Sequence, residues 1–395
     1  MDDTDIFDAV VVGGGPAGAT AATDLARKSR SVLLLDRAGR IKPCGGAIPP
    51  VLVREFEVPE HLIVARAHAA RIVSPTCQQA HMPIEGGGYV GMVDREMFDE
   101  WLRDRAETAG ATRCAASFDR VTRDADGVAR VHYWPKGGGA EESVRARAII
   151  GADGARSAVA RQCVRGASRV RYVFAYHEVI RAPADSQHDP ARCDIYYQGP
   201  LSPDFYAWIF PHGQTMSVGT GSAHKGFGLR PAVAKLRAAA GLQGLETIRR
   251  EGAPIPLRPM KRWDNGRDTV LAGDAAGVVA PASGEGIYYA MLGGRLAADA
   301  VEQFLVTGKA GALRAARQRF MRAHGRVFLV LGFLQWFWYA NDKRRETFVK
   351  ICRDPDVQRL TWEGYMHKRM VRREPMAHLR VFFKDLGHLF GMARS

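Results

Sequence analysis

The sequence predicts a mixed α/β protein. A parallel sheet with flanking helices is interrupted by an inserted antiparallel sheet and followed by a helical C-terminal region. An apolar strand at residues 7–12 runs into a glycine-rich turn and a helix, which is typical of a parallel sheet. Residues 170–262 are rich in short apolar runs, aromatic residues and Gly/Pro turns, which is typical of an antiparallel sheet. Helical patterns dominate from about residue 284 onward.

The turn after the first strand has the glycine spacing of a dinucleotide-binding site. Gly13 permits a tight turn, Gly15 allows the backbone to approach a pyrophosphate, and Gly18 allows the next helix to pack closely on the sheet. The phosphates would rest on N–H groups at the positive end of that helix, whose first turn contains Pro16 and Ala17. We therefore predict that this turn binds the phosphates of a dinucleotide.

The second strand, at residues 31–36, ends in the carboxylate of Asp36. An acid at this position accepts hydrogen bonds from the adenosine ribose and disfavours a 2′-phosphate, so NADP is not expected as the resident dinucleotide. The adjacent Arg37 is included among the expected cofactor-binding residues. A second glycine motif, at residues 86–91, has no apolar strand before it and is predicted to be a loop.

The remaining pattern predicts a discontinuous nucleotide domain. Residues 94–109 have helical spacing, short strands follow near residues 117–134, and a strand at residues 144–150 leads into another glycine turn. The expected divisions are a nucleotide domain at residues 1–75, 92–165 and 262–325, an inserted sheet domain at 76–91 and 166–261, and a basic helical region at 326–395.

Most of the net positive charge lies in the last fifth of the chain. The formal net charge is +14, and residues 309–395 contain 19 Lys and Arg against 7 Asp and Glu. Within this region, the apolar segment at residues 327–340 contains tryptophan and is too short to span a bilayer. It is either a helix on an anionic membrane surface or a core helix with solvated basic ends. Nucleic acid is not expected as a partner, because no recognition motif accompanies the charge.

The cysteine pattern and the start of the chain indicate a cytoplasmic protein. The six cysteines include no CxxC pair, which argues against a disulfide framework and a zinc site. No cluster with metal-ligand spacing is found, so no metal is expected. The acidic segment at residues 2–5 leads directly into a strand, unlike a signal peptide.

Two further motifs resemble flavin-contact segments of FAD enzymes built like the aromatic hydroxylases. They are residues 151–154, which include Asp153 and Gly154, and a later turn that begins with Gly273 and Asp274. The resemblance implies a Rossmann-like FAD-binding domain of the aromatic-hydroxylase type. In that family the carboxylate equivalent to Asp274 holds the ribityl hydroxyls of FAD.

The same resemblance extends to a helix start and to an arginine. A turn containing Gly284 and Gly286 leads into a helix at Ile287. The positive end of this helix would face the flavin pyrimidine edge, where reduced flavin carries negative charge. Arg95 matches the family's Asp-Arg element, whose arginine approaches the ribityl–phosphate part of the cofactor. Together these motifs predict FAD.

A closer resemblance, to the geranylgeranyl reductases, covers essentially the whole chain. Residues 356–365 and 382–386 look like the photosynthetic branch of that family. Two more specific elements are a Cys-Gly-Gly turn at Cys44, Gly45 and Gly46, and a YxWxFP…GxG signature made of Tyr206, Trp208, Phe210, Pro211, Gly219 and Gly221.

This resemblance implies reduction of a geranylgeranyl chain to phytyl. The chain would be carried by (bacterio)chlorophyll or by geranylgeranyl diphosphate, with NADPH as a transient reductant. A lipophilic pigment substrate favours a protein attached peripherally to an anionic photosynthetic membrane through residues 327–345. No motif indicates an oligomeric state.

The reaction adds a hydride to one carbon of an isolated alkene and a proton to its neighbour. Tyr206, Trp208 and Phe210 alternate on a predicted strand, so their side chains share a face that either lines a prenyl tunnel or packs the sheet core. We single out Cys44 and Tyr206 as candidate catalytic residues, although Cys44 is alternatively an unreactive thiol. The other candidate proton donors are His177 and His212.

Three other functions share parts of this pattern. An FAD-dependent monooxygenase of the aromatic-hydroxylase type has the same motifs but consumes oxygen. A reductase of archaeal-type prenyl lipids differs in its substrate. A prenyl carrier on the same fold would have no need of the flavin motifs.

Overall fold

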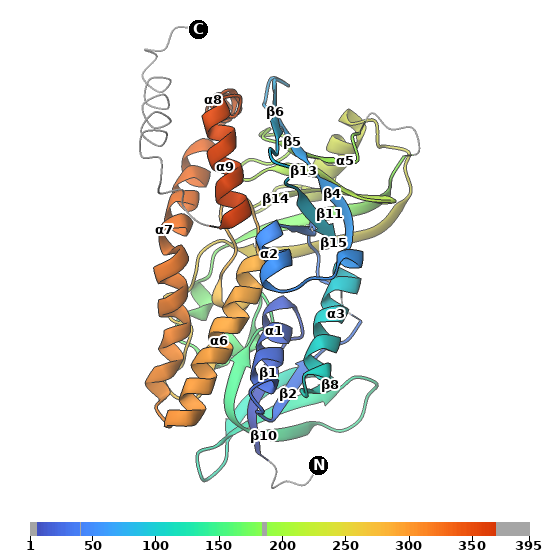
Figure 1. Ribbon diagram of the computed structural model, residues 1–395. Helices are drawn as coiled ribbons and strands as arrows, with labels where there is room; N and C mark the ends of the chain where they lie inside the picture. Colours follow the sequence, from blue (N-terminus) through green and yellow to red (C-terminus); the bar gives the residue numbers. More distant parts are fainter. Residues whose placement is uncertain (1–5, 40, 184–187, 369–395) are drawn as a thin grey trace. The chain divides into compact units, whose positions relative to one another are not determined.

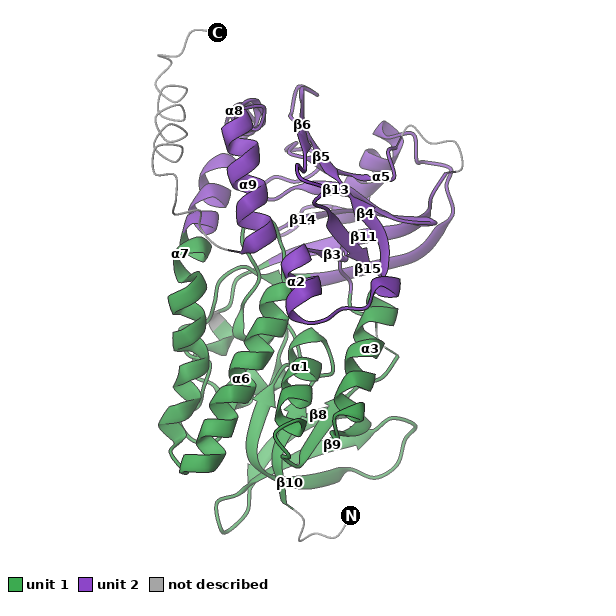
Figure 2. Cartoon of the chain, in the orientation of Figure 1, with its two compact units in different colours: residues 1–42, 95–172, 254–329 green, residues 43–94, 173–253, 330–395 purple. Residues whose placement is uncertain are grey.

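The computed structural model describes residues 6–39, 41–183 and 188–368, and the chain forms two compact units (Figure 2). Unit 1 contains residues 1–42, 95–172 and 254–329, and unit 2 contains residues 43–94, 173–253 and 330–395. Residues 43–75 were expected in the nucleotide domain but belong to unit 2, because their strands pair with strands of that unit. The motif at residues 382–386 lies outside the described residues.

The elements of unit 1 follow the predicted order, and α3 is the helix expected at residues 94–109. In chain order they are β1 (Ile6–Val12), α1 (Pro16–Ala26), β2 (Val32–Asp36), α3 (Arg95–Thr108), β8 (Thr112–Arg123), β9 (Ala129–Pro135), β10 (Glu142–Gly151), α4 (Ala158–Cys163), β16 (Thr269–Leu271), α6 (Ile287–Thr307) and α7 (Arg314–Trp338), the last continuing past residue 329.

The elements of unit 2 come mostly from the strand-rich middle of the chain. In chain order they are β3 (Ala47–Ile48), α2 (Pro50–Glu55), β4 (Ile63–Ala67), β5 (Ala69–Val73), β6 (Gln79–Pro83), β7 (Val90–Val93), β11 (Tyr172–Arg181), β12 (Arg192–Tyr196), β13 (Ala207–His212), β14 (Thr215–Ser222), α5 (Leu229–Ala239), β15 (Thr247–Pro256), α8 (Asp342–Ile351) and α9 (Pro355–His367).

A parallel sheet forms the centre of unit 1 (Figure 1). β1 pairs with β2 on one side and with β10 on the other, and β8 and β16 extend the sheet outward from these two strands. Val10 and Val11 of β1 are fully buried, as are Ile149 and Ile150 of β10, which lie opposite them. The strands are apolar on both faces because both faces are covered.

Helix α1 contacts both α3 and α6 in unit 1. The contact with α6 depends on a residue without a side chain, since a Cβ at Gly294 would lie 2.1 Å from the carbonyl oxygen of Ala17. The start of α1 is equally close to the sheet, because a Cβ at Gly18 would lie 1.8 Å from the carbonyl oxygen of Gly13. These approaches hold the glycine-rich turn in a fixed position at the end of β1.

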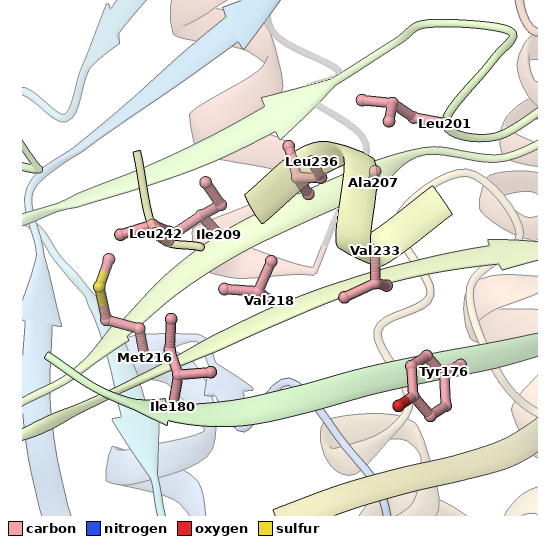
Figure 3. Packing of buried hydrophobic residues seen from close by; sticks show 10 residues of the cluster. All are labelled: Tyr176, Ile180, Leu201, Ala207, Ile209, Met216, Val218, Val233, Leu236 and Leu242. Atoms are coloured by element: carbon pink, nitrogen blue, oxygen red, sulfur yellow. The ribbon is translucent and has the colours of Figure 1, made fainter. Parts of the chain in front are cut away.

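Unit 2 contains a seven-stranded sheet in the order β15-β11-β14-β13-β12-β5-β6. One face of this sheet packs against α5 through an apolar cluster (Figure 3), which includes Ile209 of β13, Val218 of β14, and Val233 and Leu236 of α5. Residues adjacent to these in β13 and β14 point to the opposite face, because side chains alternate along a strand. The glycine motif at residues 86–91 forms the predicted loop and the start of β7.

The apolar segment at residues 327–340 lies mainly in helix α7. Trp336 is 68% exposed and Phe333 56% exposed, whereas Trp338 is only 5% exposed. The segment therefore has an exposed apolar face as well as a buried one. No helix within the described ranges has the length and hydropathy that crossing a bilayer requires.

Candidate functional site

In unit 1 the predicted cofactor residues gather at one edge of the parallel sheet. β1 ends at Val12, β2 at Asp36, β10 at Gly151 and β16 at Leu271, and the glycine and aspartate motifs follow directly. Parallel strands that pair in register place their carboxyl ends together, and ligands of open α/β sheets bind at that edge. Four motifs far apart in the sequence thus form one site.

The first turn of α1 leaves room for a phosphate. Gly13 has a φ of +105°, and a Cβ there would lie 2.4 Å from the carbonyl oxygen of Ala152, so glycine is required. A Cβ at Gly15 would meet no atom within 4 Å, and Gly15 caps the helix with Pro16 in its first turn. The helix N-terminus therefore faces an open space, which suits a pyrophosphate.

Asp36 is held in place by the turn and by an arginine from α3. Its Oδ1 accepts a hydrogen bond from the backbone N–H of Gly14 at 3.3 Å, and Nη1 of Arg103 lies 3.3 Å from its Oδ2. Arg103 is buried and also donates to the carbonyl oxygen of Gly14. Arg37, by contrast, is exposed.

The Asp153 carboxylate caps a helix. Its oxygens accept hydrogen bonds from the Ser157 hydroxyl at 2.5 Å and from the backbone N–H of Ala158 at 2.6 Å, at the start of α4. Burial raises the pKa of Asp153 above its usual value, although these hydrogen bonds oppose the shift. Gly154 has a φ of +87° and has open space around it.

Asp274 and the start of α6 form the opposite part of the edge. The Asp274 side chain is 8% exposed, and its Oδ2 accepts a hydrogen bond from Nζ of Lys42. Gly286 caps α6 just before Ile287, and a Cβ at Gly286 would lie 3.8 Å from Oδ1 of Asp274. Two further glycines shape the turns on either side of this carboxylate, namely Gly273, with a φ of +62°, and Gly284, with a φ of +65°.

Arg95 begins α3 and is engaged within its own helix. Its guanidinium donates two hydrogen bonds to Asp99, at 2.9 and 2.7 Å, and both side chains are buried. Arg95, Asp99 and Arg103 follow one another at intervals of four residues, so they lie along one side of α3.

In unit 2 the aromatic signature lies on the sheet face opposite α5. Tyr206 directly precedes β13, and its ring centroid is 5.9 Å from that of Trp208, which is 6.0 Å from that of Phe210. Trp208 lies over Gly219 of β14, where a Cβ would come within 2.3 Å of the indole. Gly221 occupies the matching position two residues further on.

The Cys-Gly-Gly turn packs directly on this aromatic face. A Cβ at Gly45 would lie 3.1 Å from the Phe210 ring, and one at Gly46 would lie 2.7 Å from Nε2 of His212. Cys44 is partly exposed, and its Sγ accepts a hydrogen bond from the backbone N–H of Gly46 at 3.4 Å.

The titratable groups on this face have shifted pKa values. Burial raises the pKa of the Tyr206 phenol far above its usual range, which makes it a weaker acid. Desolvation lowers the pKa of His212 to about 4, so its imidazole is neutral at pH 7. Among the residues that the structure describes, no group of His, Cys, Asp and Glu could hold a metal ion.

The residues of the unit 1 edge fit FAD. The open position at Gly15 would accept the pyrophosphate, Asp36 the adenosine ribose, and Asp274 the ribityl hydroxyls. A family model described as an FAD binding domain matches residues 6–314. A geranylgeranyl diphosphate reductase of Rhodobacter capsulatus is 54% identical over 387 residues, which cover 98% of each chain. This chain belongs to the geranylgeranyl reductase family of FAD-dependent oxidoreductases.

More distant relatives carry related names. A chloroplastic geranylgeranyl diphosphate reductase of Oryza sativa is 36% identical over 96% of this chain and 85% of its own. A digeranylgeranylglycerophospholipid reductase of Methanosarcina acetivorans is 31% identical over 77% of each chain. Members of the family are thus named for reactions on different geranylgeranyl compounds.

Solved structures agree with the fold. A geranylgeranyl bacteriochlorophyll reductase-like protein of Thermoplasma acidophilum has a TM-score of 0.80 at 21% identity and covers 94% of this chain and 99% of that one. A p-nitrophenol 4-monooxygenase of Pseudomonas putida has a TM-score of 0.69 at 16% identity. It covers 93% of this chain and 99% of its own chain. The aromatic-hydroxylase type of fold predicted from the motifs is confirmed.

Several residues of this geranylgeranyl reductase family member escaped the sequence reasoning. Arg103 at the ribose position could have been noticed from its four-residue spacing after Arg95 and Asp99. Lys42 lies two residues before Cys44 of the Cys-Gly-Gly turn, but its contact with Asp274 joins residues 232 positions apart. No local pattern predicts such a pair.

Proposed function

We propose that this protein uses FAD to reduce isolated carbon–carbon double bonds of a geranylgeranyl chain. The observation that carries the proposal is the 54% identity, over 98% of both chains, to a geranylgeranyl diphosphate reductase. Reduced FAD supplies a hydride when bound, and the protein supplies the position, the exclusion of water and the proton. The residues of unit 1 described above bind the cofactor.

The aromatic face of unit 2 is the surface that contacts the prenyl chain. Tyr206, Trp208 and Phe210 form a continuous row of rings, and the adjacent strand has no side chain at Gly219 and Gly221. Each methylene group removed from water contributes about 0.8 kcal/mol, so an apolar surface can hold the chain with few polar contacts. Aromatic faces also stabilise the positive charge that develops on carbon during the reaction. Cys44 and Tyr206 contact the reacting part of the chain.

The substrate in this proposal is geranylgeranyl (bacterio)chlorophyll or geranylgeranyl diphosphate, and the product carries a phytyl chain. NADPH is the transient reductant. Within the described residues, the GxGxxG spacing between a strand and a helix occurs once, at β1 and α1, and this motif is assigned to FAD. NADPH therefore reduces the flavin without a dinucleotide domain of its own.

Peripheral attachment to an anionic membrane involves helix α7. Leu329, Phe333 and Trp336 are exposed at intervals of four and three residues, so they share one side of the helix. Arg326 and Arg322 are exposed on the same side, about one and two turns before Leu329. An apolar face with adjacent basic residues is the pattern of a helix that lies on a membrane surface. The buried Trp338 takes no part in this contact.

The test is mass spectrometry of products after anaerobic incubation of the FAD-loaded protein with NADPH. Geranylgeranyl pigment and geranylgeranyl diphosphate are offered separately. Stepwise gains of two hydrogens, up to six, on either compound support the proposal and identify the substrate. Flavin that is bound and reducible, with no gain on either compound, would contradict it. Oxygen consumption driven by an aromatic substrate would instead support the monooxygenase alternative.

A further inference from the structure

Four neighbouring strands of unit 2 bring buried polar side chains together on the aromatic face. The strands are neighbours in the sheet, in the order β15, β11, β14 and β13. Glu251 lies on β15, His177 on β11, Ser217 on β14 and Trp208 on β13. Glu251 stands on the edge strand, while Trp208 belongs to the aromatic row. The group therefore leads from the edge of the sheet to the surface proposed to hold the prenyl chain.

The contacts along this row are direct. Nε2 of His177 lies 3.0 Å from Oε2 of Glu251, and Nδ1 of His177 lies 2.9 Å from Oγ of Ser217. The indole N–H of Trp208 donates to the same Ser217 oxygen at 3.1 Å. Each ring nitrogen of His177 thus faces an oxygen, and Ser217 lies between the imidazole and the indole.

Burial decreases along the row toward the sheet edge. The side chain of His177 is 4% exposed and that of Glu251 is 13% exposed. Oε1 of Glu251 lies 3.0 Å from Nε of Arg249, and Arg249 in turn lies 3.8 Å from the partly exposed carboxylate of Asp94. Polar groups therefore connect the buried imidazole with groups that solvent can reach.

The number of hydrogen bonds that the Ser217 hydroxyl can accept and donate indicates where its own proton can go. A hydroxyl has two acceptor lone pairs and one donor hydrogen. When both nitrogens of His177 carry a proton, its Nδ1–H and the indole N–H of Trp208 fill both lone pairs of the Ser217 oxygen. The hydroxyl hydrogen must then point to a third group. The described part of the chain offers no such third partner to Ser217 Oγ.

On the basis of the proposed function, we propose that the proton for double-bond reduction is supplied by His177, supported by Glu251, and delivered by the hydroxyl of Ser217. The Ser217 O–H bond breaks as its proton forms a C–H bond at one alkene carbon, and the Nδ1 proton of His177 moves to Ser217 Oγ. The neighbouring carbon receives a hydride, which reduced FAD would supply when bound, so the alkene gains two electrons and the reduced flavin loses two. Nε2 of His177 keeps its proton beside Glu251 throughout, and solvent protonates Nδ1 again after the product has left.

The surroundings of His177 differ from those of Cys44 and Tyr206, the two candidate catalytic residues predicted from the sequence. Tyr206 is a weaker acid than a free phenol, because burial raises its pKa. Cys44 has a backbone N–H as its hydrogen-bond donor. His177, in contrast, combines a carboxylate on one nitrogen with a hydroxyl relay on the other.

The experiment measures one turnover with the flavin already reduced. FAD-loaded full-length protein is reduced anaerobically and mixed with geranylgeranyl diphosphate or geranylgeranyl pigment, whichever the wild type reduces, and recovery of oxidised-flavin absorbance is followed. We expect the rate constant to fall at least about 100-fold in H177Q and S217A, the scale of a lost proton donor. FAD content and reduction of the flavin by dithionite should be unchanged. E251Q should lower the rate and enlarge the solvent isotope effect.

Matched variants separate proton supply from a structural effect. Glu178 follows His177 in β11 but points to the opposite face, where it pairs with Arg237, so E178Q should keep the wild-type rate constant. Added imidazole should restore activity to H177A but not to S217A. C44A and Y206F test the other candidate acids directly.

Two results would overturn the assignment. One is a rate constant in H177Q within about threefold of the wild-type value. The other is a loss in C44A or Y206F that exceeds the loss in H177Q while FAD remains bound. Absence of alkene reduction by the wild type would contradict the proposed function itself, and this inference with it.

Discussion

Nζ of Lys42 lies 2.5 Å from Oδ2 of Asp274, the carboxylate expected to hold the ribityl hydroxyls of FAD. Because Asp274 is buried, loss of its partner leaves an unsatisfied charged acceptor, which costs about 1–3 kcal/mol. We expect K42M to lower the free energy of unfolding of the FAD-free protein by about this amount. The loss should be smaller with FAD bound, because the ribityl hydroxyls then donate to Asp274.

Urea unfolding with and without FAD checks this prediction. K28M is the control, since Lys28 forms a surface pair with Asp299 in which both side chains are 39% exposed. Such pairs contribute little to stability. Equal losses in K42M with and without FAD would contradict the assignment of Asp274 to the cofactor.

Gly15 should be required for the cofactor but not for folding. Its φ of −76° suits alanine, and a Cβ there meets no protein atom within 4 Å. We expect G15A to unfold at a urea concentration close to that of the wild type when FAD is absent. Its FAD dissociation constant should rise at least about tenfold, because the methyl group occupies the pyrophosphate space. A Cβ at Gly311, also in unit 1, would likewise meet no atom within 4 Å, so G311A is the control. It should change neither the urea midpoint nor the FAD dissociation constant.

Gly219 should be required for the aromatic face. A Cβ there would lie 2.3 Å from the Trp208 ring and 2.6 Å from Cβ of His177. We expect G219A to lose about 1–3 kcal/mol of stability through overpacking and to shift the tryptophan fluorescence. FAD content should remain close to that of the wild type, while reduction of the prenyl chain falls. G244A, in open space in unit 2, should behave as the wild type does.

The exposed side of α7 should determine binding to anionic vesicles. Phe333 and Trp336 are 56% and 68% exposed, so changing both to Ser removes apolar surface without opening the core. We expect this double variant to lose most of its binding in vesicle flotation while it retains FAD. Trp134 of β9 is 47% exposed outside α7, and W134S is the control. Equal binding by the double variant and the wild type would exclude α7 as the contact.

His212 should make the protein less stable in mild acid. Its pKa is lowered to about 4 in the folded protein because the ring is desolvated, compared with 6.5 for the free side chain. Between these values the unfolded state binds the proton and the folded state does not, so stability falls as pH falls from 6.5 toward 4. We expect H212Q to show a weaker decline over this range in urea unfolding. If the stability of H212Q and of the wild type declined equally with pH, groups other than His212 would dominate the pH dependence.

Most of unit 1 could be predicted because its signals are local. The apolar run of β1, the glycines of the turn and the acid at the end of β2 lie within one βαβ segment, and each has a direct physical meaning. The boundary between the two units could not be predicted from the sequence as well as the elements of unit 1. Residues 43–75 follow β2 without a break in composition, and only their pairing with β7 and β12 assigns them to unit 2.

The site was predicted in part for the same reason. Motif residues such as Gly15 and Asp274 were identifiable, because their chemistry depends on neighbours in sequence. Arg103, Lys42 and Glu251 act on residues 67 or more positions away, so their roles become visible only after the strands are paired. The alternation of Tyr206, Trp208 and Phe210 predicted a shared face, but not the Ser217 hydroxyl beside it.

The three-part construction of unit 1 has a consequence during translation. β16 and the start of α6 complete the carboxyl edge that begins with Gly13, yet the ribosome makes them after all of the strands of the seven-stranded sheet. A nascent chain therefore exposes an incomplete parallel sheet until about residue 290 has left the exit tunnel. The proposed FAD site is incomplete before that point, so we expect cofactor supply to affect the later part of synthesis and not its early intermediates.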